Sequence, residues 1–598
     1  MPINLLLSES EWAALSDKLE DPFFQRVHAN NERAVDIMIE EGREDFWNLA
    51  GDLTRPDLGR GNPWNWRVPK NRLYRFALSW RLTGREDSLA EALRAVDVLL
   101  DRSYWRAHER FGLRHADLST ADWWTNATFA LEALAPALSE ERENGLRQLL
   151  TEWALPAYLK GVEEGDWWRY AEFNWGAAVH GGAGLAALAV QDTAPDLAGR
   201  ALAAARRGLR FVIDNLPAGG GWTEGLMYQT TTLAHLTEFV AALHPLTGDD
   251  LGLAANPRLH DSLDSRLRML GGDQHPLNFS NINERSEEWR LPAAYWWARR
   301  CGRPEWAGFE DAFPRLWQDT LGIAYEVETF WWREAHQPTK PWTQAGGLWH
   351  GRELDWLSWR RRRTWLGLRS GFNGGNHNNL DLGQVIFGVD EARILRDPGY
   401  GIGQTARHSC ITLKGRDQTI DASAKIFRAE EFSVADGWLL HVACDLRACY
   451  PHTLDRHVRH LLAFSDGALL LIDDLLAARG HRLRATGRLQ LASEPETSED
   501  GWRMPLGSGD GEIRIRFPLP AEASLGEAFE HEGQTTHPLT YTSGVDAPAA
   551  LFAVSLSCEG AISVRREDRR LIVSRGETEA TLDLDSGIVH PPIPLIQP

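Results

Sequence analysis

Residues Ser370–Gly383 read SGFNGGNHNNLDLG, a run with four glycines, four asparagines, one histidine and one aspartate. Strand-like runs lie on both sides of it, at Thr364–Leu368 and Gln384–Phe387. Glycine adopts backbone conformations that are closed to other residues, and asparagine tolerates them nearly as well. The composition therefore predicts either a loop that aims His377 at a ligand or an ordinary hairpin turn with a surface histidine.

The segment after Gln337–Pro341 is typical of an antiparallel β-sandwich. Short β-type runs follow one another there, separated by turns rich in glycine and aspartate such as Ser465–Gly467. The runs are Ser409–Leu413, Trp438–Val442, His460–Phe464, Leu469–Ile472, Ile513–Phe517, Leu551–Leu556, Ile562–Arg565 and Leu571–Val573. Many short strands in succession indicate a sandwich, which we place at residues 341–598.

Residues 1–340 are typical of a helical array. Ser88–Leu100 and Glu141–Leu155 carry apolar residues at helical spacing, whereas Gly182–Val190 is small and apolar on all sides and predicts a buried helix. Thr230–Leu243 and Leu291–Arg300 add two more helices. Successive helices with modest loops, and without a fixed repeat period, predict a helical array or toroid.

Composition excludes several classes of protein. The chain has 598 residues, of which 43% are hydrophobic, so it is long enough for at least two domains and cannot be disordered throughout. Its net charge of −20 argues against nucleic acid and anionic membranes as partners. No apolar run reaches the roughly 18 residues that a membrane span needs. Five scattered cysteines, without a CxxC pair, favour reduced thiols.

Met1–Phe24 lacks the basic start, unbroken apolar stretch and small-residue cleavage site of a secretory leader. We therefore expect a cytoplasmic protein, or a periplasmic or secreted one if a leader has been removed. For the oligomeric state, a homodimer is among the alternatives.

The chain contains 27 tryptophans, many of them in pairs. An indole ring has an apolar face and a polar edge, which suits stacking against sugar rings. Large helical arrays also use tryptophan as core filler, so we expect most of these residues in the core and a minority along a groove.

Two residues of the helical region are candidates for a reactive site. Asn174 lies next to Trp175, just before a glycine-rich helix, where its amide can either donate hydrogen bonds into a cleft or cap the helix. Tyr228 follows Glu224-Gly225. Its phenol can transfer protons, although a tyrosine in the core or at a rim is the commoner role.

Beyond His377, polar residues continue with Asp381, Asp397 and His408. A histidine, a carboxylate and a second histidine on neighbouring strands can form a Zn²⁺ site. The separations of 20 and 11 residues between His377, Asp397 and His408 form no closed local motif. Phosphate-binding loops, HExxH and GxSxG in a convincing context are missing from the sequence.

Taken together, these motifs resemble the heparinase II/III-like polysaccharide lyases, a family that includes oligoalginate lyases. The family signature His-Asn-His-x-Asp-x-Gly is similar to His377–Gly383, and its Asp-Pro-Gly turn to Asp397–Gly399. A later family histidine corresponds to His408, and the toroid motifs to Asn174-Trp175 and Glu224–Tyr228. The resemblance spans about residues 120 to 475. It implies an incomplete α/α toroid followed by an antiparallel β-sandwich.

One position departs from the signature. The second histidine of the family, a zinc ligand, is Asn379 here, whereas the other implied ligands, Asp397 and His408, are present. An asparagine oxygen is a poor replacement for imidazole at Zn²⁺, which prefers nitrogen and sulfur donors. The resemblance therefore leaves three alternatives open: a zinc site, a weaker one, or a hydrogen-bond network of similar shape. No organic cofactor is expected.

The resemblance implies an enzyme that cleaves acidic poly- or oligosaccharides by β-elimination. Asn174, together with His377, would neutralise the uronate carboxylate, and Tyr228 would act as general acid and base. For the opposite configuration at C5, His377 itself could be the base. The remaining substrate contacts would come from aromatic, histidine and arginine side chains: Trp175, His180, Tyr400 and Arg285.

Two other functions remain open. A toroid glycoside hydrolase would use paired carboxylates, for instance Asp122 with Glu224, and its products would carry no new double bond. A glycan-binding protein without activity would bind uronates but not cleave them.

Overall fold

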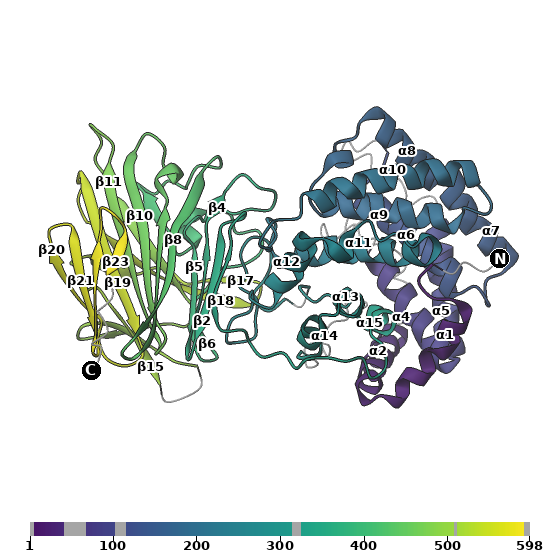
Figure 1. Cartoon of the computed structure of the whole chain (residues 1–598), viewed down its shortest axis with the longest axis horizontal. Coiled ribbons are helices and arrows are strands. Elements are labelled where there is room, and N and C mark those ends of the chain that lie inside the picture. The colour runs from purple at the N-terminus through teal and green to yellow at the C-terminus, as the bar shows by residue number, and fades with distance from the viewer. Residues whose placement is uncertain are drawn as a thin grey trace. The chain divides into compact units, whose positions relative to one another are not determined.

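The chain folds into two units, one helical and one built from strands (Figure 1). The computed structural model describes residues 5–40, 67–101, 115–286, 288–313, 325–507 and 511–590. The helical unit comprises Met1–Leu216, Tyr228–Leu259 and Glu287–Trp342, and the strand-rich unit comprises Pro217–Met227, His260–Ser286 and Thr343–Pro598. Two short segments from the helical half of the sequence thus belong to the strand-rich unit. A single domain boundary near residue 340 does not describe this division.

Helices make up the first half of the chain, as the apolar spacing predicts. The helices are α1 (Glu9–Ala14), α2 (Pro22–Glu40), α4 (Arg67–Thr83), α5 (Glu86–Leu100), α6 (Leu118–Ala133), α7 (Glu140–Gln148), α8 (Leu155–Glu164), α9 (Asn174–Ala189), α10 (Pro195–Asp214), α11 (Leu226–Thr247), α12 (Pro257–Arg266), α13 (Ala293–Cys301), α14 (Pro304–Asp311) and α15 (Tyr325–Trp332). Among the described helices, none is both long and apolar enough to cross a lipid bilayer.

Helix α9, which begins at the candidate residue Asn174, is buried along almost its whole length. Every residue from Asn174 to Ala189 except Trp175 is buried, so the predicted buried helix is confirmed and begins eight residues earlier than expected. Glycines allow its neighbours to approach closely. A Cβ at Gly182 would lie 2.8 Å from the carbonyl oxygen of Ala121 in α6.

Three antiparallel sheets form the strand-rich unit, and each predicted strand is present. The first, of ten strands, runs β1 (Gly347–Gly351), β2 (Trp356–Arg361), β3 (Thr364–Arg369), β5 (Val385–Val389), β6 (Ala392–Leu395), β12 (Ala485–Leu491), β18 (Gln534–Thr542) and β16 (Glu522–Leu525), with β7 (Ile411–Leu413) on β12 and β17 (Phe529–His531) on β18. The second, of nine strands, runs β13 (Glu496–Ser498), β14 (Gly501–Pro505), β15 (Glu512–Arg516), β19 (Ala549–Ser557), β11 (Ala468–Ala477), β10 (Leu454–Phe464), β9 (Gly437–Asp445), β8 (Ser423–Val434) and β4 (Gly371–Phe372). The third runs β20 (Ser563–Glu567), β21 (Arg570–Arg575), β22 (Thr578–Asp583) and β23 (Ile588–His590).

Alternating side chains of the nine-stranded sheet fill two separate cores. Leu461 and Leu471, which are cross-strand partners, belong to the core shared with the ten-stranded sheet. Their neighbours Leu462 and Leu470 belong to a second core, shared with the four-stranded sheet. Successive strand residues point to opposite faces, so a strand that is apolar at every position is buried on both faces. The sandwich is therefore confirmed, with a third sheet that the sequence analysis did not separate.

The segment His260–Ser286 is tied to the ten-stranded sheet by an arginine. Arg393 of β6 is buried, donates to Asn278 Oδ1 at 3.0 Å and to the carbonyl of Pro276 at 2.9 Å, and pairs with Asp273 at 2.8 Å. A Cβ at Gly367 in β3 would lie 2.9 Å from Leu277 of the segment. These contacts fix the position of the residues that follow, Ser280 and Asn281.

Replacement of Gly182 by alanine tests the close approach of α9 to α6. Alanine favours a helix by about 1 kcal/mol over glycine, but its methyl group would collide with a main-chain oxygen, so we expect Gly182→Ala to lower the free energy of unfolding by about 1–3 kcal/mol. Gly199→Ala in α10 is the matched control, because no atom lies within 4 Å of the added Cβ. We expect it to stabilise the protein by up to about 1 kcal/mol. Equal effects of both changes in urea unfolding would contradict the close approach.

Candidate functional site

The loop between β3 and β5 crosses from one sheet to the other. β3 pairs with β5 in the ten-stranded sheet, whereas β4, at the start of the loop, pairs with β8 in the nine-stranded sheet. The loop is therefore not an ordinary hairpin turn. His377 adopts a φ of 56°, a left-handed conformation that is uncommon for residues other than glycine. Such a conformation persists only where the surrounding contacts hold it.

Arg369, at the end of β3, holds this loop from inside. Its guanidinium is 1% exposed and forms an ion pair with Asp381. The same group donates to the carbonyls of Phe372 at 3.3 Å and Asn379 at 3.4 Å. A planar guanidinium presents several donors in a fixed geometry, which suits several acceptors of one loop. Arg369 thus fixes the course of the chain on both sides of His377.

Three segments of the strand-rich unit meet at His377. Asn281 Nδ2 lies 2.8 Å from His377 Nδ1, and Glu224 Oε1 lies 3.7 Å from His377 Nε2. The imidazole is 29% exposed. Burial lowers the pKa of His377, which favours the neutral ring at neutral pH.

Glu224 is a buried carboxylate with donors at both oxygens. Trp222 Nε1 donates to Oε2 at 3.1 Å, and Asn376 Nδ2 donates to Oε1 at 2.7 Å. Donors at both oxygens favour the ionised carboxylate. This environment suits a charged partner of His377 better than the protonated general acid of a glycoside hydrolase. Asp122, the other carboxylate of that alternative, is buried in α6 of the helical unit.

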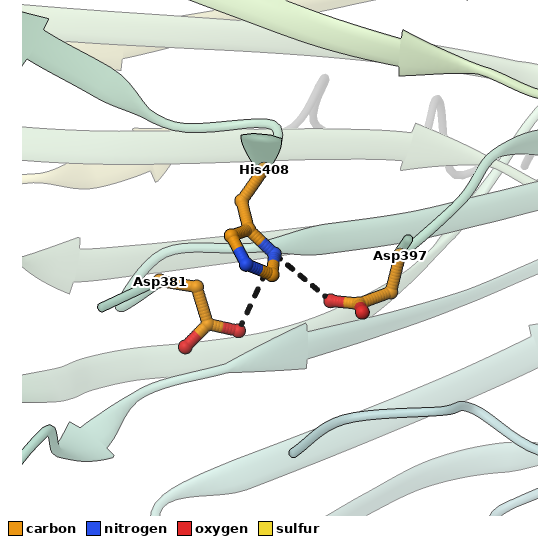
Figure 2. Close-up of side chains that lie close together, drawn as sticks. All are labelled: Asp381, Asp397 and His408. Atoms are coloured by element: carbon orange, nitrogen blue, oxygen red, sulfur yellow. Dashed lines mark hydrogen bonds and ion pairs between the residues drawn. The ribbon is translucent and has the colours of Figure 1, made fainter. Parts of the chain in front are cut away.

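Figure 2 shows a second cluster, in which Asp381, Asp397 and His408 converge. His408 Nδ1 lies 3.2 Å from Asp397 Oδ2 and 3.8 Å from Asp381 Oδ2. His408 Nε2 lies 2.8 Å from the carbonyl oxygen of Ile402. Burial alone would lower the pKa of His408, but the carboxylates of Asp397 and Asp381 outweigh burial and raise it to about 9. Burial raises the pKa of Asp397.

The cluster differs from the ligand set expected from the sequence. Asp397 and His408 come together as expected, and Asp381 is a third donor that the sequence analysis did not assign. Asn379 is buried, and its main-chain oxygen accepts from Arg369. Its Nδ2 has no hydrogen-bond partner among the described residues. Asp381 is the aspartate of the signature at His377–Gly383, so the sequence does contain a signal for this third donor.

Asn174 and Tyr228 both lie in first helical turns of the helical unit. Asn174 is the first residue of α9 and makes no capping hydrogen bond, so it does not act as an N-cap. Its Oδ1 is buried without a hydrogen-bond partner among the described residues, which is rare for a native side chain. Tyr228 lies in the first turn of α11 and is 7% exposed.

His180 lies in the core, in contrast to the expected substrate contact. Its Nδ1 lies 2.8 Å from Tyr158 Oη, and its Nε2 lies 3.2 Å from the carbonyl oxygen of Arg169. Burial lowers the pKa of His180 to about 4. With both ring nitrogens engaged inside the protein, His180 is a packing residue rather than a ligand contact.

The other expected substrate residues lie at or near the surface. Trp175 is half-buried, and its ring lies 4.7 Å from that of Trp167, which is 50% exposed. Tyr400 is half-buried in the loop after β6, where its N–H donates to Asn283 Oδ1 at 2.9 Å. Arg285 is exposed. Their contact with a substrate stays a prediction.

Sequence comparisons identify no relative of this chain: no family model matches it, and no curated protein does either. Comparison of the fold gives a different result. The chain has the fold of heparinase III and chondroitin AC lyase. Heparinase III aligns with 91% of this chain and 84% of its own length, at 12% identity and a TM-score of 0.60. A mutant of the heparan sulfate lyase HepC from Pedobacter heparinus aligns with 91% of this chain and 84% of its own length, at 14% identity and a TM-score of 0.59.

The chondroitin AC lyase of Streptomyces coelicolor A3, solved with chondroitin sulphate, aligns with 96% of this chain and 87% of its own length. Its identity is 14% and its TM-score 0.54. The expected architecture, a helical α/α toroid followed by antiparallel β-sheets, is therefore confirmed. At these sequence identities the comparison establishes the fold but not the chemistry, which depends on the residues of this chain.

Replacement of Arg369 tests whether this side chain holds the loop. Arg369→Met would leave Asp381 buried without its cationic partner, a change that typically costs about 3–5 kcal/mol. We expect faster hydrogen exchange at residues 372–381 and a lower midpoint of thermal unfolding. Arg369→Lys keeps the charge but not the fork of donors, so it should restore part of the protection. Unchanged exchange in the methionine variant would contradict this role.

Proposed function

We propose that this protein is a polysaccharide lyase that cleaves uronic-acid-containing glycans by β-elimination. The observation that supports the proposal most strongly is the likeness of more than nine-tenths of the chain to solved lyases of heparan sulfate and chondroitin. A second support is the loop of His377, whose sequence is similar to the family signature. The backbone of His377 has a left-handed conformation, and its imidazole lies beside Glu224 and Asn281.

For β-elimination the protein must neutralise the uronate carboxylate, remove the C5 proton and protonate the leaving oxygen. The C5 proton of a uronate is weakly acidic, because the adjacent carboxylate resists further negative charge. In our proposal the amide of Asn174 and the Nε2–H of His377 donate to that carboxylate and stabilise the intermediate. Neutral donors of this kind act where charge develops in the transition state.

Tyr228 transfers the proton in this proposal. As a phenolate it takes the C5 proton, and the C5–H electron pair becomes the C4–C5 double bond. The bond between C4 and its glycosidic oxygen breaks, and the leaving oxygen receives the proton from the phenol of Tyr228. The products are a 4,5-unsaturated uronate and a chain with a new hydroxyl group, so atoms and charge balance.

We further propose a divalent cation at Asp381, Asp397 and His408, with zinc as the ion that the resemblance favours. The donors fit such an ion: one imidazole and two carboxylate oxygens converge in a buried position. Asp381 Oδ2 has no hydrogen-bond partner among the described residues, and the carbonyl of Ile402 orients the imidazole so that Nδ1 faces the carboxylates. The ion would supply positive charge between the loop before β5, which carries Asp381, and the connection from β6 to β7, which carries Asp397 and His408.

Elemental analysis of the purified protein tests the cation. We expect about one zinc per chain, and removal of it by a chelator should lower the thermal midpoint, because a ligand that binds only the folded state stabilises it. Asp397→Asn should lose the metal and show no further change with chelator. Metal-free protein with the same midpoint before and after chelation would instead assign the cluster to a hydrogen-bond network of Arg369, His408 and the two carboxylates.

Absorbance of the product tests the elimination. Incubation with a uronate polymer should give a product that absorbs in the near ultraviolet, and Tyr228→Phe should lower the rate by roughly 10²–10⁴-fold, the usual contribution of general acid–base catalysis. Tyr170→Phe is the matched control, since Tyr170 is 62% exposed, and it should keep full activity. Activity retained in Tyr228→Phe, with an unchanged circular dichroism spectrum, would remove Tyr228 from the mechanism.

A further inference from the structure

The direction of the hydrogen bonds around Asn281 decides which nitrogen of His377 carries the proton. The main-chain N–H of Gly401 donates to Asn281 Oδ1 at 3.1 Å, so the amide group of Asn281 must present Nδ2 to its other neighbour. That neighbour is His377 Nδ1, at 2.8 Å. Nδ2 can only donate, and His377 Nδ1 therefore accepts. In the neutral imidazole the hydrogen then resides on Nε2.

Glu224 reinforces the same arrangement from the other side of the ring. Its Oε1 lies 3.7 Å from His377 Nε2, so a lone pair on Nε2 would face a carboxylate, whereas an N–H at Nε2 is attracted to it. The distance is too long for a hydrogen bond, so Glu224 acts on the N–H by charge and position rather than by accepting it. Glu224 is 1% exposed and is itself held by Trp222 and Asn376. The carboxylate is therefore held in place beside the imidazole.

We propose that Glu224 and Asn281 are positioning residues that keep His377 as an Nε2–H donor, and that the protein consequently selects uronates whose C5–H and C4–O bonds lie on the same face of the ring. The inference rests on the lyase function proposed above. A histidine held in this tautomer has no lone pair with which to accept the C5 proton. It can neutralise the carboxylate, but it cannot serve as the base on the opposite face.

The tautomer of His377 determines which C5 epimer of a uronate can react. In β-D-glucuronate and β-D-mannuronate residues, the C5–H and C4–O bonds lie on one face, so a single group such as Tyr228 can take the proton and return it to the leaving oxygen. In their C5 epimers, iduronate and guluronate, the two bonds lie on opposite faces and the reaction needs a second group as base. With His377 held as a donor, the epimers lack that base.

A comparison of epimeric substrates tests the selection in the unmodified protein. Oligosaccharides of glucuronate or mannuronate should give the unsaturated product, and the matched iduronate or guluronate oligosaccharides should react at least about 100-fold more slowly, the usual contribution of a general base. Equal rates on both epimers would overturn the inference while leaving the lyase function intact. Absence of unsaturated product from all four would overturn the proposed function itself.

Two isosteric variants test the positioning residues. Asn281→Asp replaces the donor Nδ2 by an acceptor and should move the proton to Nδ1, and Glu224→Gln removes the charge that faces Nε2. We expect kcat on the preferred substrate to fall roughly 10–100-fold in each variant, as for other residues that orient a functional histidine. KM should change much less than kcat, because the substrate contacts remain. Glu224→Asp keeps the charge and should recover part of kcat.

Glu431→Gln is the control for the loss of a partly buried carboxylate. Glu431 in β8 accepts from the indole N–H of Trp359 at 3.3 Å, as Glu224 does from Trp222, but its other oxygen pairs with Arg361. Its kcat should stay within about two-fold of the unmodified value, a shift of less than about 0.5 kcal/mol in the barrier. If Glu431→Gln lowers kcat as much as Glu224→Gln, or if Asn281→Asp keeps full kcat, the positioning role is wrong.

Discussion

The buried guanidinium of Arg369 is the interaction on which the site in the strand-rich unit depends. It neutralises Asp381 and donates to main-chain carbonyls at two further points of the loop. Without a cation at this place, the loop would have to bury a carboxylate and several unpaired carbonyls, each at a cost of kilocalories per mole. The left-handed conformation of His377 can persist because its neighbours in sequence are fixed in this way.

Arg369 also links the two side-chain clusters to which this loop contributes, one at His377 and one at Asp381. His377 lies four residues before Asp381, and the two side chains have different partners: His377 meets Asn281 and Glu224, whereas Asp381 faces His408. A change that loosens one cluster should therefore be felt in the other through the short segment between them. This coupling would give the proposed cation at the second cluster a structural role that needs no contact with substrate.

The sequence predicted local structure well and spatial partners less well. The helices, the strands and the special character of the loop at His377 follow from periodicity and from turn residues, which are local properties. The partners of His377 are 96 and 153 residues away along the chain, at Asn281 and Glu224, and belong to two segments that join the strand-rich unit from the helical half of the sequence. No local pattern encodes such contacts. His180 lies beside the motif of Asn174, yet it packs into the core, because proximity in sequence does not decide which way a helical side chain points.

Glu224 separates the alternatives that the sequence left open. A general acid of a glycoside hydrolase presents a proton to the leaving oxygen, whereas both oxygens of Glu224 already accept hydrogen bonds inside the protein. A protein that only binds glycans gains nothing from a buried charge aimed at a histidine, since desolvation of that charge weakens the fold. That cost is reasonable in the proposed lyase, where Glu224 would help to keep the proton on one nitrogen of His377. In that proposal the neutral donor is suited to a uronate carboxylate, and it restricts the direction from which the C5 proton can be removed.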